Sequence, residues 1–139
     1  QIFMNTPMAP NGAGCAVCHQ GETMSAVEAN SNGLEANSEL DAGYGEVTGA
    51  SGDMGTFKVP SLRNIAVRAT FMHDGRFSSL REVVDHYSDS VQAHPNLGMP
   101  LNMHDFHFSE EEREALVSFL ETLTDEDMLS DPKFANPFE

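Results

Sequence analysis

Cys15-Ala16-Val17-Cys18-His19 contains the only two cysteines of this 139-residue chain, and a histidine follows the second one directly. This C-x-x-C-H arrangement indicates covalent attachment of a haem. On a helical turn, the spacing places both sulfurs where they can reach the two vinyl groups of one porphyrin. The imidazole of the next residue then points at the iron. We therefore predict one covalent haem c, attached through Cys15 and Cys18, with His19 as an axial ligand of the iron.

Two other uses of paired cysteines fit the rest of the sequence less well. A disulfide or a thioredoxin-like redox pair requires a βαβ context, and the flanking sequence shows no strand pattern. A zinc site requires ligands from a second paired cluster, and the chain has no further cysteine. A haem also buries a large apolar face, which offsets the entropy cost of ordering a polar chain. Without haem we expect no stable fold.

The length and composition fit a single domain over residues 1–139. No apolar run approaches the ~18 residues of a membrane span, so we expect no membrane insertion. The net charge of −15 repels nucleic acid and favours a redox partner with a basic docking surface. Haem attachment of this type takes place outside the cytoplasm, so we expect a periplasmic or secreted protein whose leader has been removed. The start at Gln1 fits an excised part of a longer protein equally well.

Three segments have the apolar spacing of short helices. Residues 79–87 and 109–123 each carry one apolar face and begin with a capping box, Ser79 with Glu82 and Ser109 with Glu112. Residues 58–72 begin with a proline-set turn and continue as a short helix with Ser61 as its N-cap. We predict an all-α, cytochrome c-like fold of about four to five short helices around the haem.

Long irregular segments separate these helices. Residues 21–56 are acidic and rich in Gly, Ser and Asn, which predicts a long surface loop held by the cofactor. Residues 124–139 contain two prolines and are expected to form an irregular C-terminal tail.

The basic residues are unevenly distributed, since five of the seven fall between Lys58 and Arg81. That segment requires an anionic neighbour, and the haem propionates supply one. We predict that Arg63, beside Pro60 and Ser61, contacts a propionate. The alternative is that Arg63 is an ordinary surface arginine.

Four stretches resemble the C-terminal haem domain of bacterial di-haem cytochrome c peroxidases and MauG-type enzymes. They are FKVPSLRNI (57–65), FMHDGRF (71–77), LREVVDHY (80–87) and LVSFLETLTD (116–125). The resemblance implies a second haem domain elsewhere in the full-length protein. It also implies that His73, in the His-Asp-Gly motif, contacts a propionate or tunes electron entry, the alternative being a turn held by Asp74. The family's calcium-binding Thr-x-Pro segment is replaced by Arg68-Ala69-Thr70.

The resemblance further implies a distal iron ligand after the His-Asp-Gly motif, Met in the peroxidases and Tyr in the MauG type. Tyr87 occupies that position here. Phenolate stabilises ferric iron and lowers the reduction potential, whereas a thioether raises it. Met99 and Met103 flank Pro100 in a loop of the kind that brings Met to haem iron, so they stay as alternatives, followed by Met72, His86 and an open site. The alternative to iron ligation is that Tyr87 packs in the core as an ordinary aromatic side chain.

Three functions remain open from the sequence. The first is a mono-haem domain that transfers single electrons in an extracytoplasmic redox chain. The second is the C-terminal half of a di-haem enzyme that reduces hydrogen peroxide, for which this chain supplies no catalytic residue. The third is a haem module that feeds electrons to a larger enzyme.

Overall fold

The computed structural model describes residues 1–6, 8–9, 12–103 and 106–138. Its α-helices are α1 (Gly45–Thr48), α2 (Leu80–Asp85), α3 (Glu110–Glu121) and α4 (Glu126–Ser130). Short 3₁₀ turns are η1 (Cys15–Val17), η2 (Ser51–Asp53), η3 (Ile65–Val67) and η5 (Pro132–Phe134), and a π-helical turn, η4 (His86–Ser90), continues α2. β1 (Ala29–Asn30) pairs antiparallel with β2 (Phe57–Lys58). The expected, largely helical fold with long loops is confirmed.

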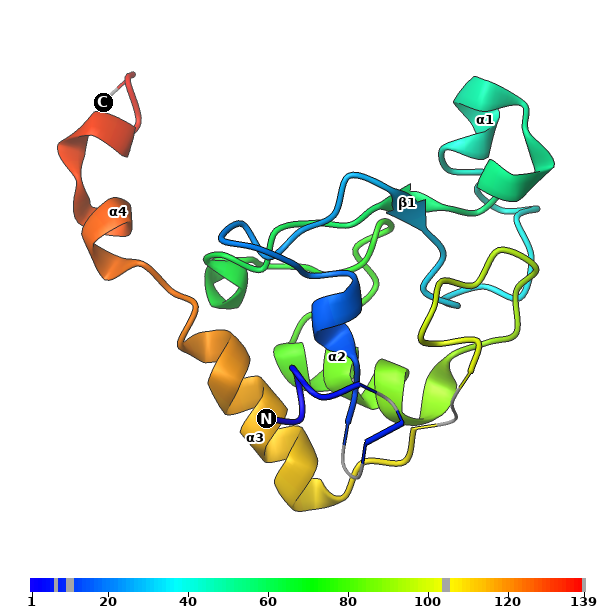
Figure 1. Cartoon of the computed structure of the whole chain (residues 1–139). Coiled ribbons are helices and arrows are strands. Elements are labelled where there is room, and N and C mark those ends of the chain that lie inside the picture. Colours follow the sequence, from blue (N-terminus) through cyan, green and yellow to red (C-terminus); the bar gives the residue numbers. More distant parts are fainter. Residues whose placement is uncertain (7, 10–11, 104–105, 139) are drawn as a thin grey trace.

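The core lies where α2 and α3 pack against each other beneath the N-terminal segment (Figure 1). It consists of buried side chains from both helices and from the loops above them: Phe3, Leu62, Ile65, Phe71, Leu80, Val84, Leu116 and Leu120. Cys15 and Ala16 of η1 pack against this cluster, so the cysteine turn rests on the core. The main cluster of buried side chains is therefore small for a chain of this size.

Both predicted capping boxes are present. The Ser79 side chain accepts the Glu82 backbone N–H, and the Glu82 carboxylate accepts the Ser79 N–H at 3.0 Å. Ser109 and Glu112 make the same reciprocal pair at the start of α3. Each box satisfies two of the N–H groups that a helix start leaves unpaired. The two helices of the core therefore begin where the sequence predicted.

Two predictions about local structure were wrong. Ser61 caps no helix: its hydroxyl accepts the Arg63 N–H and donates to the Thr23 carbonyl, and the following 3₁₀ turn η3 begins only after Asn64. The tail is not irregular throughout, since α4 begins there. Its N-cap is Asp125, whose carboxylate accepts the Met128 N–H at 2.9 Å. In Figure 1 this C-terminal segment projects away from the core.

The loop 21–56 is less open than the sequence predicted. Its middle, Ser31 to Leu34, is buried or half-buried, and backbone hydrogen bonds connect it to the segment after η4. The Gln92 N–H donates to the Gly33 carbonyl at 2.7 Å, and the Gly98 N–H donates to the Ser31 carbonyl at 3.0 Å. The loop is thus joined to the end of the α2–η4 helix. In the part of the chain that the structure describes, no helix is both long enough and apolar enough to cross a membrane.

Leu116→Ala is expected to lower the free energy of unfolding of the haem-bearing protein by ~2–5 kcal/mol, because it leaves a cavity between α2 and α3. Leu116 is 5% exposed, whereas Leu129 on α4 is 48% exposed. Urea unfolding monitored by circular dichroism measures the free energy of unfolding of wild type, of Leu116→Ala and of a control variant at Leu129. The control Leu129→Ala should cost less than ~1 kcal/mol; equal losses in the two variants would contradict this account of the core.

Candidate haem site

The two cysteines and the histidine lie on one tight turn. Gly14, with φ 63°, introduces η1 in a left-handed conformation that glycine adopts without strain. The N–H groups of Cys18 and His19 both donate to the Cys15 carbonyl, at 3.2 and 2.9 Å. This turn presents Cys15, Cys18 and His19 together. Both thiols are free, so the alternative of a disulfide is not realised in this structure.

The His19 imidazole is arranged as a metal ligand. Its Nδ1 lies 3.1 Å from the Met24 carbonyl oxygen, and the Pro60 carbonyl also lies near the ring. Burial lowers the pKa of His19, which favours the neutral imidazole. A neutral ring that donates Nδ1–H to a carbonyl keeps Nε2 free to bind iron, which is the usual arrangement of a ligating histidine. These contacts fit the predicted role of His19.

The two cysteines are protonated in this structure. Burial raises the pKa of the Cys15 thiol to about 12 and also raises the pKa of Cys18. Both are therefore neutral thiols at neutral pH. Among the residues that the structure describes, no group of three or more His, Cys, Asp or Glu side chains could hold a metal ion. The donor set fits covalent attachment of an apolar macrocycle rather than a zinc site.

Tyr87 lies on the side of the core that carries the two cysteines. It belongs to the π-helical turn η4, a rare geometry that is frequent at functional sites. Burial raises the pKa of the Tyr87 phenol to about 12, and charge on Cys15 and Cys18 would raise it further. A hydrogen bond from the Asn32 side chain opposes this shift. The phenol therefore lies close enough to Cys15 and Cys18 to interact with them electrostatically, and its role as a distal ligand stays a prediction.

The other candidate ligands differ from Tyr87 in their exposure and in their hydrogen-bond partners. Met99 and Met103 are 60% and 56% exposed, although the Met99 carbonyl accepts a 3.5 Å contact from the Cys18 Sγ. The Met72 thioether accepts the Asn32 Nδ2–H at 3.2 Å. His86 is buried with its Nε2 at 3.1 Å from the Asn32 carbonyl. Tyr87 itself is half-buried, and its phenol interacts electrostatically with both cysteines.

The structure places the other predicted haem contacts, Pro60, Arg63 and His73, in different surroundings. The Pro60 carbonyl lies near the His19 ring, and the Arg63 Nε donates to the Glu22 carbonyl at 2.8 Å. His73 is exposed and stacks on Phe57, with ring centroids 3.8 Å apart. The contacts of Arg63 and His73 with a propionate stay predictions.

Two arginines of the basic segment have anionic partners within the chain. Arg76 forms ion pairs with Glu35 and Asp74, and Arg81 pairs with Asp85 and Glu110. Their positive charge is therefore already matched by carboxylates. Of the basic residues between Lys58 and Arg81, these two need no propionate.

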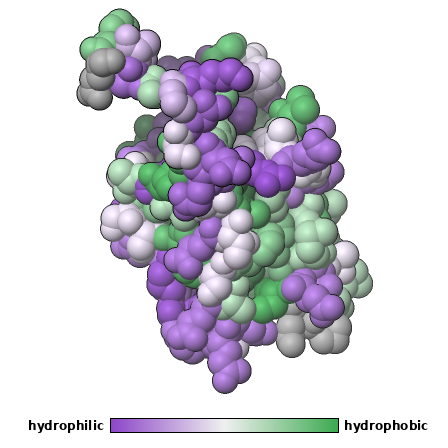
Figure 2. Space-filling model, turned by 90° about the vertical axis from the view of Figure 1, so that its left-hand side faces the viewer, coloured by the Kyte–Doolittle hydropathy of each residue, from purple (hydrophilic) through white to green (hydrophobic). Residues whose placement is uncertain are grey.

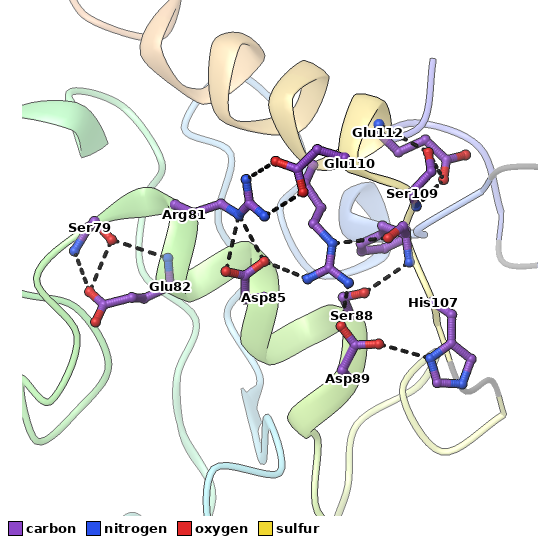
Figure 3. A network of polar contacts seen from close by, with 12 residues as sticks. Ser79, Arg81, Glu82, Asp85, Ser88, Asp89, His107, Ser109, Glu110 and Glu112 are labelled. Carbon is purple, nitrogen blue, oxygen red and sulfur yellow. Dashed lines mark hydrogen bonds and ion pairs between the residues drawn. The ribbon is translucent and has the colours of Figure 1, made fainter.

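A polar network holds the Tyr87-bearing helix against α3 (Figure 3). The carboxylate of Asp85 lies between Arg81 and Arg113, and the carboxylate of Asp89 between Arg113 and His107. Arg113 also donates to the Phe108 carbonyl at 2.9 Å. The network spans both ends of η4 and therefore fixes the backbone that carries Tyr87.

Two residues of this region were not foreseen from the sequence. Arg113 occurs near the acidic start of a helix, where the composition is typical of a solvent-exposed face. Asn32 occurs in the acidic loop. The spacing of Asp85, Asp89 and Arg113 could have indicated the network only once α2 and α3 were known to pack together. Nothing local in the sequence marks Asn32.

Asp89→Asn is expected to remove an acid-sensitive contribution to stability. Hydrogen bonds from His107 and Arg113 lower the pKa of Asp89 to about 2. The stabilisation is therefore fully present above the unfolded-state pKa of ~3.9 and is lost as the pH falls towards 2. Asp89 is partly exposed, so the effect at pH 6 should be below ~1 kcal/mol.

The measurement is urea unfolding of the haem-bearing protein at pH 6, 4 and 3. The difference between wild type and Asp89→Asn should shrink as the pH falls. Asp127→Asn, which removes an exposed carboxylate on α4, is the control and should show no such trend. A difference that stays constant down to pH 3 would refute the role of the Asp89 carboxylate.

Comparison with known proteins gives a consistent result. A family model described as Cytochrome c matches residues 2–124. The chain is 38% identical over 111 residues to the methylamine utilization protein MauG of Methylorubrum extorquens. It is 32% identical over 117 residues to the cytochrome c551 peroxidase of Nitrosomonas europaea. These matches cover 80% and 81% of this chain but only 31% of each relative.

A solved structure agrees with the sequence matches. The crystal structure of a MauG-like protein associated with microbial copper homeostasis superposes with a TM-score of 0.76 at 30% identity. The superposition covers 91% of this chain and 44% of that one. The chain thus spans about a third of the curated relatives and less than half of the solved structure.

Proposed function

Because the chain belongs to the cytochrome c family, we propose that it carries a single haem c and transfers one electron at a time in an extracytoplasmic redox chain. Within that family it is homologous to MauG and to bacterial cytochrome c peroxidases, as its sequence motifs suggested. The family implies covalently bound haem c, and two cysteines suffice for one such group.

The observation that carries this proposal is the position of Tyr87, which is half-buried in η4 and interacts electrostatically with Cys15 and Cys18, the proposed attachment residues. In this proposal His19 and Tyr87 would both bind the iron, so that protein side chains would leave no open site for a substrate. A closed iron site favours electron exchange over substrate binding, because little has to rearrange when the charge changes.

The residues of the site have separable roles in this proposal. Cys15 and Cys18 tether the haem, which supplies reversible one-electron chemistry when bound. The Met24 carbonyl holds the tautomer of His19. Arg63 and His73 are the proposed propionate contacts.

A peroxidase role within a longer protein is the second candidate. Two observations favour it: several relatives are named as cytochrome c peroxidases, and the chain spans 31% of each of the relatives described above. In that case this domain would relay electrons to a second haem domain, or to the active site of a larger enzyme, and that partner would carry the chemistry. Its proposed role as an electron carrier is the same in each case.

The acidic surface suggests the kind of partner. The net charge is −15, and hydrophilic side chains cover much of the face in Figure 2. A surface of one sign steers an oppositely charged protein into contact, and salt screens the effect. We therefore propose a basic redox partner in the periplasm or outside the cell.

Electron exchange with a basic redox protein tests this function. Stopped-flow mixing of the reduced haem-bearing domain with an oxidised basic cytochrome should give fast exchange, slowed at least ~10-fold between 10 mM and 0.5 M salt. An acidic acceptor of similar potential is the control and should react slowly at low salt and faster as salt rises. An absence of exchange with either acceptor would refute the electron-transfer proposal.

A further inference from the structure

The turn that follows His19 is held by a segment 38 positions further along the chain. Three consecutive carbonyls of residues 22–24 accept hydrogen bonds from residues 61–63. The contacts run from the Arg63 Nε to the Glu22 carbonyl at 2.8 Å, from the Ser61 Oγ to the Thr23 carbonyl at 2.6 Å, and from the Leu62 N–H to the Met24 carbonyl at 3.4 Å. The last of these carbonyls is the one that lies 3.1 Å from the Nδ1 of His19.

The backbone of Met24 is in an unusual conformation. Its φ is 49°, in the left-handed region that residues other than glycine rarely adopt. Its N–H donates to the Gly21 carbonyl at 3.1 Å, and Gln20 pairs with Ser25 across the base of the turn. A strained residue of this kind persists only where the surrounding structure fixes it. The contacts with residues 61–63 supply that fixation from outside the turn.

A second hydroxyl crosses between the same two segments in the opposite direction. The Ser25 Oγ donates to the carbonyl of Val59 at 2.7 Å, and Val59 is buried. Both serine contacts have the usual length of a good O–H···O hydrogen bond. Because Thr23 and Ser25 are the two neighbours of Met24, the Met24 carbonyl is held from both sides.

We propose that Ser61 and Ser25 are positioning residues that keep the Met24 carbonyl on the His19 imidazole and thereby set the reduction potential of the iron. This inference rests on the proposed function, in which His19 binds the iron of an electron-carrying haem. The serines act only through the Met24 carbonyl.

The chemistry of the imidazole gives the effect its direction. A carbonyl that accepts the Nδ1–H makes the imidazole a more basic ligand, and hydrogen bonds of this kind are among the means by which a protein sets the potential of a haem. A more basic ligand stabilises ferric iron. Loss of the serine hydroxyls should loosen the Met24 carbonyl, make the imidazole a weaker donor and raise the potential. Thr23 is exposed, so water can replace the Ser61 hydroxyl on its carbonyl and the fold should survive.

The test compares Ser61→Ala, Ser25→Ala and the double variant in the haem-bearing protein. Ser130→Ala is the matched control, because the Ser130 Oγ also donates to a backbone carbonyl, that of Glu126 at 2.9 Å, on exposed α4. The readouts are the reduction potential, from an optical redox titration, and the solvent exchange of the His19 Nδ1 proton, from NMR of the ferrous protein. Haem content and circular dichroism confirm the fold.

The double variant is expected to shift the ferric–ferrous equilibrium at least ~10-fold towards the ferrous form, ~59 mV for a one-electron couple. The Nδ1 proton should exchange at least ~10-fold faster, because its acceptor is no longer fixed. Each single variant should give a smaller shift in the same direction. Ser61→Thr, which keeps the hydroxyl, and Ser130→Ala should both behave as wild type.

A double variant with the potential and the Nδ1 exchange of wild type would overturn the positioning role. If the double variant folds poorly, Ser61→Ala and Ser61→Thr decide, and equal shifts in these two would refute a role of the hydroxyl. Electron exchange of the wild type with a basic cytochrome separates this failure from that of the proposed function. Unshifted serine variants of a wild type that exchanges electrons refute the positioning role alone, whereas a wild type without exchange refutes the proposed function.

Discussion

Replacing Cys15 and Cys18 together by alanine should abolish the folded domain as well as the covalent haem. The polypeptide core is small: its main cluster has eight buried side chains, four of them from α2 and α3. Total stabilities of domains are only ~5–15 kcal/mol, so a cofactor with a large apolar face decides whether this chain folds. The polar loop 21–56 adds an ordering cost that the core alone does not offset.

Denaturing electrophoresis with haem staining and far-ultraviolet circular dichroism measure the two effects. Val17→Ala is the matched control, since Val17 lies between the cysteines, is 41% exposed and leaves both thiols intact. It should retain covalent haem and helical structure. A cysteine-free variant that unfolds cooperatively with wild-type stability would show that the haem is not required for the fold.

Tyr87→Phe should open the distal side of the iron while leaving the haem attached. Phenylalanine keeps the aromatic packing in η4 but has no oxygen to bind iron, so the ferric protein should change from low spin to high spin. Loss of an anionic oxygen ligand removes a preference for ferric iron. The reduction potential should therefore rise by more than ~59 mV, a tenfold shift for a one-electron couple.

The chain offers a matched control for this variant, because Tyr44 is its only other tyrosine and is 50% exposed. Tyr44→Phe should leave the spectrum and the potential unchanged. Electron paramagnetic resonance of the ferric proteins reports the spin state directly. A Tyr87→Phe protein that stays low spin with an unchanged potential would assign the distal position to another residue, with Met99, Met103, Met72 and His86 as the remaining candidates.

The parts of the fold that the sequence predicted are those with local physical causes. The capping boxes at Ser79 and Ser109 were predicted because a helix start is satisfied by residues three positions apart. The turn that carries Cys15, Cys18 and His19 has a local cause as well, and its role in haem attachment stays a prediction. The family resemblance then added the larger framework, which the comparisons confirmed.

The parts that the sequence did not predict depend on contacts between distant segments. Asn32 reaches Met72 across 40 positions of the chain, and Arg113 reaches Asp85 across 28. A polar loop residue gives no sign of such a partner before the packing is known. The helix α4 is a different case, because Asp125 with the Met128 N–H is a local cap that could have been recognised.

The π-helical turn η4 shows how the site and the fold are connected. An α-helical face of Leu80, Val83, Val84 and Tyr87 was predicted, and the structure keeps Leu80 and Val84 in the core. Beyond Asp85 the helix widens, which changes the direction of the residues that follow. The Arg113 contacts with Asp85 and Asp89 hold both sides of this change. The direction of Tyr87 is therefore set by tertiary contacts rather than by helical periodicity.

A closed, electron-transferring iron site is tested most directly by spectroscopy of the haem-bearing wild-type domain. The ferric optical and electron paramagnetic resonance spectra are recorded before and after addition of hydrogen peroxide. The expected result is a low-spin iron with the signature of an oxygen ligand and without a thioether band, unchanged by peroxide. A high-spin iron that reacts with peroxide would contradict the closed site and favour a peroxidase.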